Sequence, residues 1–269
     1  MVIQHNIAAI NSYRNLSTNQ SALSKNLEKL SSGYKINRAG DDAAGLAISE
    51  SMRSQINGLN QAVSNANDGV GLIQTAEGAL TETHSMLQRL KTLSTQAANG
   101  TYTKTARDNI KAEVDALTQE IDRISTATEF NGVKPLSQGT TMTFQIGATK
   151  SETLSLATAD MSSTGLQIKN LDVSDVKNAN AAIDTINSAI DTVSGYRAKL
   201  GAAQNRMEHT INNLKVTSEN VTAAESRIRD TDMADEMTSY TKNNILMQAA
   251  QSMLAQSNSM PQGVLNMLQ

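Results

Sequence analysis

The sequence contains no cysteine and no tryptophan, and proline occurs only twice in its 269 residues. The absence of cysteine excludes disulfide bonds and thiolate metal sites. Aromatic residues make up 3% of the chain, so a core built on large rings is excluded as well. The first proline is Pro135, so no proline interrupts a helix in the residues before it. These absences favour long helices that pack through Leu, Ile, Val, Met and Ala.

Charge and hydropathy exclude several kinds of partner. The formal net charge is −3 and the isoelectric point is near 5.7, so we expect no basic surface that could bind nucleic acid. No segment approaches the ~18 consecutive apolar residues of a membrane-spanning helix, so we expect no membrane insertion. The first twenty residues lack a basic region followed by an apolar stretch and a cleavage site, so we expect no cleavable secretory peptide.

The sequence offers no set of residues suited to catalysis or metal binding. His5, His84 and His209 lie far apart, and no HExxH motif is present. These histidines are better interpreted as surface or seam residues. The adjacent Asp41 and Asp42 precede an Ala-rich segment and are better interpreted as a helix cap than as catalytic acids. We therefore predict no enzyme activity and no cofactor.

The longest regular pattern follows Asp42. Apolar residues recur there at alternating steps of four and three, which is typical of the seam of a coiled coil. Asp41 or Asp42 would cap the start of this helix, and Asn99 with Gly100 would end it. The predicted helix has about 57 residues and a length of about 85 Å, at ~1.5 Å per residue, which indicates a rod. Its seam comprises Met52, Ile56, Leu59, Val63, Ala66, Val70 and Ile73, continued by Ala76, Leu80, Leu87, Leu90 and Leu93.

Two further segments repeat this spacing. In the first, Thr105 and Asp108 resemble a capping box, and Gly132 would stop the helix. The second covers residues 183–214 and is interrupted by Arg197 and Gln204. We expect the three amphipathic helices to close on one another as an antiparallel bundle. The seam of the first segment comprises Ile110, Val114, Leu117, Ile121 and Ile124.

The middle of the chain is rich in Thr, Ser and Gly and predicts a small β-structure. Apolar residues alternate around Phe144 and again around Leu154 and Leu156. A turn at residues 147–151 would join these two runs into a β-hairpin. The predicted fold is therefore mainly α, a long antiparallel helical coiled-coil bundle forming a rod, with a small β-hairpin region in the middle of the chain.

Each end of the chain carries an apolar stripe that has no neighbouring partner in the sequence. The two ends could simply pair with each other within one chain. Alternatively, such a pair cannot cover its own apolar surface and must bury the rest against other copies, remaining disordered until assembly. The residues predicted for this self-assembly surface are Ile7, Ile10, Leu16, Leu23, Leu27, Leu30, Ile245, Leu246, Met253, Leu254, Val264, Leu265 and Leu268.

Several long motifs resemble those of bacterial flagellins, in the same order along the chain. The resemblance covers residues 1–135 and 180–269. The matching stretches read LEKLSSGYKINRAGDDAAGLAISESMRSQINGL, NANDGVGLIQTAEGAL, EIDRISTATEFNGVK, YRAKLGAAQNRMEHTINNL, ESRIRDTDMADEM and QAAQSMLAQSNSMPQGVL.

The resemblance implies a domain organisation and a function. In flagellins the two termini pair in an inner domain called D0, which implies D0 helices at 1–40 and 223–269. The adjoining domain D1 would comprise helices and a β-hairpin at 41–179 and a C-terminal helix at 180–222. The subunits polymerise into the flagellar filament that drives motility. The protein would be secreted without cleavage through the flagellar type III apparatus and would be located in the extracellular flagellum.

The resemblance also implies partners. These are further copies of the chain, an export chaperone on the C-terminal segment, the filament cap and hook-junction proteins, and host Toll-like receptor 5. The positions that match the receptor-binding residues of flagellins are Arg89, Leu93, Gln96 and Glu113. The same residues could instead form part of the core and a solvated ion pair. A hook–filament junction protein with flagellin-like ends is the alternative function.

Overall fold

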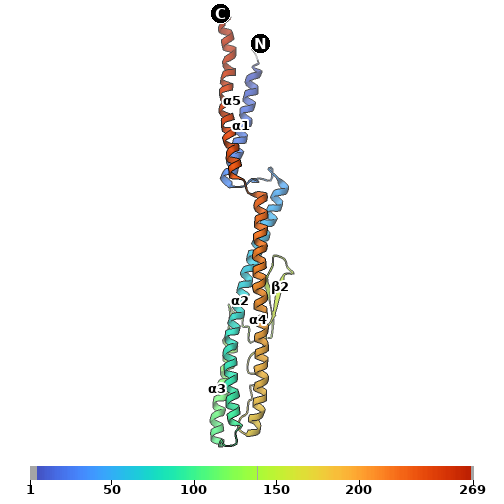
Figure 1. Cartoon of the computed structure of the whole chain (residues 1–269), viewed down its shortest axis with the longest axis vertical. Coiled ribbons are helices and arrows are strands. Elements are labelled where there is room, and N and C mark those ends of the chain that lie inside the picture. The colour runs from blue at the N-terminus through green and yellow to red at the C-terminus, as the bar shows by residue number, and fades with distance from the viewer. Residues whose placement is uncertain (1–4, 138, 268–269) are drawn as a thin grey trace. The chain divides into compact units, whose positions relative to one another are not determined.

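The computed structural model describes residues 5–137 and 139–267, and only the backbone of residues 261, 262 and 264–267. Within these residues the elements are, in order, α1 (Ile7–Ser32), α2 (Ala43–Ala97), α3 (Lys104–Ala127), β1 (Thr141–Gln145), β2 (Thr153–Ala157), α4 (Val176–Arg229) and α5 (Met233–Met267) (Figure 1). The predicted mainly α fold with a small antiparallel β-hairpin is confirmed.

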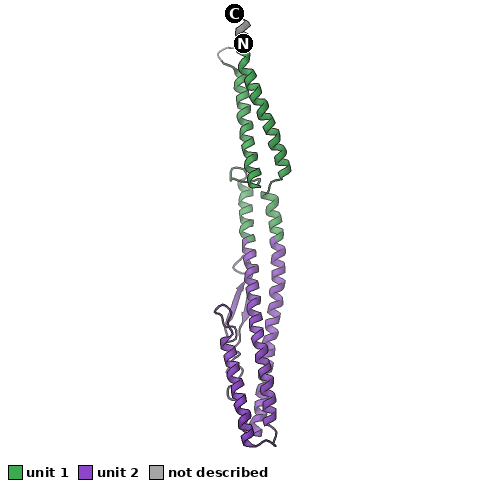
Figure 2. Ribbon diagram, turned by 90° about the vertical axis from the view of Figure 1, so that its left-hand side faces the viewer, with its two compact units in different colours: residues 1–56, 219–269 green, residues 57–218 purple. Residues whose placement is uncertain are grey.

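The chain divides into two compact units (Figure 2). Unit 1 comprises residues 1–56 and 219–269, and unit 2 comprises residues 57–218. Unit 1 therefore holds α1, α5, the start of α2 and the end of α4. Unit 2 holds α3, the hairpin and the remainder of the two longest helices.

The ends of α1 and α2 follow from their capping residues. The backbone N–H of Gly45 donates to Oδ1 of Asp42 at 2.9 Å, so Asp42 satisfies one of the unpaired donors in the first turn of α2. From there α2 runs for 55 residues, close to the predicted length. Helix α1 ends at Gly33, whose φ of 75° is the left-handed conformation that glycine adopts without steric cost.

The predicted start of α3 is wrong by two residues. The side chain of Thr103, not of Thr105, accepts the hydrogen bond of a first-turn amide, from Ala106 at 3.3 Å. Thr105 lies inside the helix, where its own amide belongs to the first turn, so the capping box with Asp108 is not formed. Both threonines are good capping residues, and their type alone does not decide which one is used.

The predicted C-terminal stop of α3 is also wrong. The helix ends at Ala127, and Gly132 belongs to a separate tight turn. Phe130 and Val133 exchange two backbone hydrogen bonds of 2.9 and 3.0 Å across this turn. The central residues, Asn131 and Gly132, have φ values of 49° and 82°. Asn-Gly at two positive φ positions is the preferred sequence of a type I′ turn.

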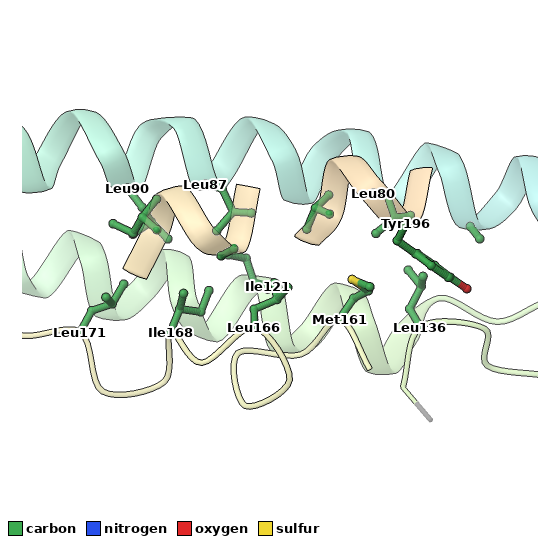
Figure 3. Packing of buried hydrophobic residues seen from close by; sticks show 14 of the residues in the cluster. Leu80, Leu87, Leu90, Ile121, Leu136, Met161, Leu166, Ile168, Leu171 and Tyr196 are labelled. Atoms are coloured by element: carbon green, nitrogen blue, oxygen red, sulfur yellow. The ribbon is translucent and has the colours of Figure 1, made fainter. Parts of the chain in front are cut away.

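The core of unit 2 lies between α2, α3 and α4 and is completed by an irregular segment. The fully buried side chains of Leu80, Leu87 and Leu90 come from α2, and Ile121 comes from α3. They face the segment that follows the hairpin (Figure 3). Each such side chain gains roughly 1.5–3 kcal/mol from leaving water. The buried residues of the irregular segment are Met161, Leu166, Ile168, Leu171 and Val173.

The hairpin adds its apolar face to the same core. In the antiparallel register, Phe144 of β1 lies opposite Leu154 of β2, and Met142 lies opposite Leu156. Leu154 and Leu156 are buried, while the intervening residues are exposed. The alternation predicted from the sequence therefore places one face on the core, as expected for a half-buried strand.

A partly exposed polar pair lies beside the core between α2 and α4. Arg197, which breaks the apolar pattern of α4, lies 3.5 Å from the carboxylate of Glu77 on α2. Tyr196 and Leu200 continue the buried stripe of α4 on either side of it. The charge of Arg197 is thus paired with Glu77 of the neighbouring helix at the edge of the core.

Candidate self-assembly surface

Helices α1 and α5 pack along each other in antiparallel orientation within unit 1 (Figure 1). Two contacts define their register. Nδ2 of Asn6 donates to the backbone carbonyl of Ser257 at 2.8 Å, at the end of the pair near the chain termini. Nζ of Lys29 lies 3.5 Å from Oε2 of Glu236 at the other end.

Helix α1 has two distinct faces. The residues that are at least half-buried recur at heptad spacing and form the face toward α5, which we call the inner seam of α1. A second, outer face carries large apolar side chains in solvent, and Ile7 is 61% exposed there. Ile10, Tyr13 and Leu27 are also exposed on α1. The inner seam comprises Ala9, Ser12, Leu16, Asn19, Leu23, Asn26 and Leu30.

Helix α5 is divided in the same way. Its exposed apolar residues include Ile245, Leu246 and Met253, and Met253 is 63% exposed. Ile245 and Leu246 line one end of a shallow groove of about 560 Å³ that continues to Met237 and Thr238. The inner seam of α5 comprises Glu236, Tyr240, Asn243, Met247, Ala250, Leu254 and Ser257.

The predicted self-assembly residues therefore fall into three groups. Leu16, Leu23, Leu30 and Leu254 belong to the inner seams. The side chains of Val264 and Leu265, and the whole of Leu268, lie outside the described residues. The exposed group comprises Ile7, Ile10, Leu27, Ile245, Leu246 and Met253.

Sequence reasoning missed part of both faces of this pair. Tyr13, Met237 and Met260 are exposed apolar residues that were not included in the predicted surface. Their helical spacing relative to Ile10 and Ile245 could have identified the first two. The polar members of the inner seams could not be found in this way, because a search for apolar periodicity passes over them.

The predicted receptor-binding positions lie on α2 and α3 in unit 2. Nε of Arg89 donates to Oε1 of Glu113 at 2.8 Å, and both side chains are about half exposed. Gln96 donates to the hydroxyl of Tyr102 at 3.0 Å, and both line a groove of about 730 Å³. Leu93 is only 2% exposed and belongs to the core. The structure therefore offers three of the four side chains to a partner.

The loop between α1 and α2 and the break between α4 and α5 contact each other through backbone hydrogen bonds. We call this contact the junction ladder. Tyr34 and Asp230 form an antiparallel β-bridge. The amide of Lys35 donates to the carbonyl of Arg229 at 2.6 Å, and the amide of Thr231 donates to the carbonyl of Gly33 at 3.0 Å. The ladder thus connects the loop after α1 with the break between α4 and α5.

The side chain of Arg229 ties this ladder to the start of α2. Its guanidinium lies 4.7 Å from the centroid of the Tyr34 ring, a cation–π contact. It also donates to Oε1 of Glu50 at 2.5 Å. This hydrogen bond is the main cause that lowers the pKa of Glu50, and the charges of Arg229 and Arg53 add to it.

Other kinds of site find no support in the described part of the chain. Its residues include no cluster of three or more His, Cys, Asp or Glu side chains that could hold a metal ion. None of the helices described is both long and apolar enough to cross a membrane.

Comparison with known proteins agrees with the two-ended organisation. The model of the bacterial flagellin N-terminal helical region matches residues 3–141, and that of the C-terminal helical region matches residues 183–268. Flagellin from Bacillus subtilis (strain 168) is 53% identical over 304 aligned positions, and flagellin from Halalkalibacterium halodurans is 51% identical over 271. Both alignments cover 100% of each chain.

A solved structure leads to the same family. The crystal structure of Bacillus cereus flagellin matches with a TM-score of 0.52 and 30% sequence identity, covering 60% of this chain and 94% of that one. The sequence, the helical ends and the fold thus agree with the resemblance predicted from the motifs. The chain belongs to the bacterial flagellin family.

Proposed function

We propose that the chain polymerises into the bacterial flagellar filament by packing the outer faces of α1 and α5 against further copies. Members of this family are structural subunits of the filament. The observation that carries the proposal is the set of large apolar side chains in solvent on both helices, among them Ile7, Ile10, Ile245 and Met253. Contiguous exposed apolar surface is typical of association sites.

The geometry of the pair supports an open polymer. The inner seams already contact each other within one chain, so the outer faces need a surface from another copy. Contacts between unlike surfaces of identical subunits produce helical filaments when they do not close into a ring. Each subunit that joins buries its own outer faces, so we expect slow nucleation and cooperative extension.

A pair of variants tests this surface. In the double variant Ile7→Ser/Ile10→Ser, we expect a folded unit 2 and loss of polymer in a sedimentation assay with filament seeds. The matched control, Ile7→Leu/Ile10→Leu, keeps the apolar area and should polymerise. Removal of the last ten residues should likewise leave a soluble helical chain that does not polymerise. Normal filaments from the serine variant would contradict the proposed surface.

The alternative function, a hook–filament junction protein with flagellin-like ends, predicts a different product. A filament former extends long polymers from seeds, whereas a junction protein adds only a few copies. Electron microscopy of the purified chain after seeding distinguishes the two. The high identity to flagellins over the whole chain favours the filament former.

Export follows from the location of the filament outside the cell. We propose that the chain leaves uncleaved through the flagellar type III apparatus and that a chaperone covers the C-terminal segment beforehand. The groove on α5 beside Ile245 and Leu246 is an apolar surface that would need such cover. The filament cap and the hook-junction proteins are the further partners proposed for the assembled state.

A second proposed function is recognition by host Toll-like receptor 5 through unit 2. Its support is the exposed Arg89–Glu113 ion pair and the exposed Gln96, which follows Arg89 two turns later on α2, at positions that match the family's receptor-binding residues. Leu93 would act by holding α2 in place, since it is buried. We expect Arg89→Ala and Glu113→Ala each to weaken receptor binding, with Lys111→Ala on the same helix α3 as the control. Unchanged affinity in both variants would contradict this proposal.

A further inference from the structure

The inner seams of α1 and α5 carry polar side chains at positions where two packed helices ordinarily place apolar ones. Asn19 and Asn26 alternate with leucines on α1, and Glu236, Asn243 and Ser257 hold seam positions on α5. Asn26 is only 8% exposed. Among the described residues, Nδ2 of Asn26, Oε1 of Glu236 and Oγ of Ser257 have no hydrogen-bond partner. The pair therefore buries polar groups while it leaves large apolar groups in solvent.

Buried polar groups distinguish between registers that apolar contacts treat alike. If the junction ladder opened and α1 slid along α5 by seven residues, the same heptad positions would still face each other. The slide would move Lys29 by about 10 Å, at ~1.5 Å per residue. Its 3.5 Å contact with Glu236 would then be lost. At the other end, the 2.8 Å hydrogen bond from Asn6 to Ser257 would be lost as well.

We infer that Asn26 and the Lys29–Glu236 ion pair fix the register of α1 against α5, at a cost in the stability of the pair itself. Asn26 and Lys29 lie about one helical turn apart on α1, so the selective groups gather at the end nearest the junction ladder. The cohesion of the terminal helices then comes from whatever covers their outer faces, while the inner seams select the alignment. This inference concerns the alignment of the two helices within one chain, and it is tested both with and without assembly.

Distance measurement between two spin labels tests the register directly. The chain has no cysteine, so Ser17→Cys on α1 and Gln248→Cys on α5, both exposed, can be labelled without other changes. The labelled full-length chain is measured alone and in seeded assemblies diluted with unlabelled chain. We expect one narrow distance distribution in the parent and, in Asn26→Leu, a second population at longer distance, because the two labels lie opposite each other and an axial slide of about 10 Å moves them apart. Asn26→Leu should also raise the resistance of α1 to proteolysis.

Charge exchange separates register from general stability. Lys29→Glu places two carboxylates together and should broaden or shift the distance, whereas Lys29→Glu/Glu236→Lys should restore it. The matched control Lys25→Glu changes an exposed charge on the same helix and should leave the distance unchanged. A single unshifted distance in both Asn26→Leu and Lys29→Glu would overturn the inference, as would a broad distribution in the parent under both conditions. If the parent chain gives a narrow distance distribution but forms no polymer after seeding, the proposed function is contradicted while the inferred register is supported.

Discussion

Leu87 is completely removed from solvent in the core of unit 2. Replacement by Ala leaves a cavity among the packed side chains of α2, α3 and the irregular segment. We expect Leu87→Ala to lower the free energy of unfolding by about 2–5 kcal/mol, in urea titrations followed by circular dichroism. Leu246→Ala on α5, where the side chain is 41% exposed, is the control and should change it by less than about 1 kcal/mol. Equal effects would contradict the assignment of the core.

Glu50 gives a pH dependence whose sign follows from its lowered pKa. The guanidinium of Arg229 stabilises the ionised form by a hydrogen bond, and Arg53 adds a weaker charge effect. The resulting stability is present above the ordinary Glu pKa of about 4.3 and is lost as the pH falls through the lowered value.

The variant Arg229→Met tests the cause of this shift. We expect the pKa of Glu50, followed by carbon-13 NMR of its carboxyl group, to rise toward the ordinary value. Arg53→Met should raise it less, because Arg229 makes the shorter contact of the two, 2.5 against 3.3 Å. A larger rise in Arg53→Met would show that Arg229 is not the main cause.

At the scale of the element, the start of α3 is set by one hydroxyl. Thr103 accepts the amide of Ala106, so Thr103→Ala should lower the free energy of unfolding by about 1 kcal/mol. Thr105→Ala lies inside the first turn and should be nearly neutral or slightly stabilising, because Ala is the better helix former. Thermal unfolding of the two variants in parallel makes the comparison. A greater loss of unfolding free energy in Thr105→Ala than in Thr103→Ala would support the capping box predicted from the sequence.

The elements of unit 2 could be predicted from the sequence because the apolar residues of each element lie on one face, and that face packs against the core. Ile110, Val114 and Ile121 of α3 recur at heptad spacing and are all buried. The hairpin is found for the same reason, since Leu154 and Leu156 alternate with exposed residues. The segment that carries Met161 and Ile168 was not found, because irregular backbone gives its buried residues no fixed period.

The candidate site could be predicted only in part, for a physical reason. The helix α1 was found from its apolar residues, but these belong to two faces, with Leu23 on the inner seam and Ile10 on the outer face. When polar residues occupy part of the inner seam, the apolar residues of both faces are read from the sequence as one stripe, and the two faces cannot be distinguished. Asn26 shows the difficulty most clearly, since its burial depends on a partner helix more than 200 residues away in sequence.

At the scale of the whole molecule, the two units differ in how they resist opening. The main core cluster lies entirely within residues 57–218, whereas among the described residues of unit 1 the buried apolar core consists of Ile36. Local opening requires less free energy where fewer apolar groups are buried. We therefore expect backbone amides of α1 and α5 to exchange with deuterium well before those around Leu87.

Assembly provides the control for this prediction. If neighbouring copies cover the outer faces, exchange in α1 and α5 should slow in the polymer, while exchange around Leu87 changes little. Mass spectrometry of peptides from monomer and polymer measures both. Terminal helices as protected in the monomer as the centre of α2 would contradict the expected difference between the units.

The junction ladder has a mechanical consequence. Two segments of the chain connect the pair of α1 and α5 to the neighbouring helices. One is the loop that begins at Gly33 and leads to α2, and the other is the short break after Arg229 that separates α4 from α5. Because Tyr34 and Asp230 are bridged, both connecting segments resist a torque on α5 together. Neither segment can rotate alone without breaking backbone hydrogen bonds. The break between α4 and α5 therefore carries a coupling in which load on one chain segment is shared by the other.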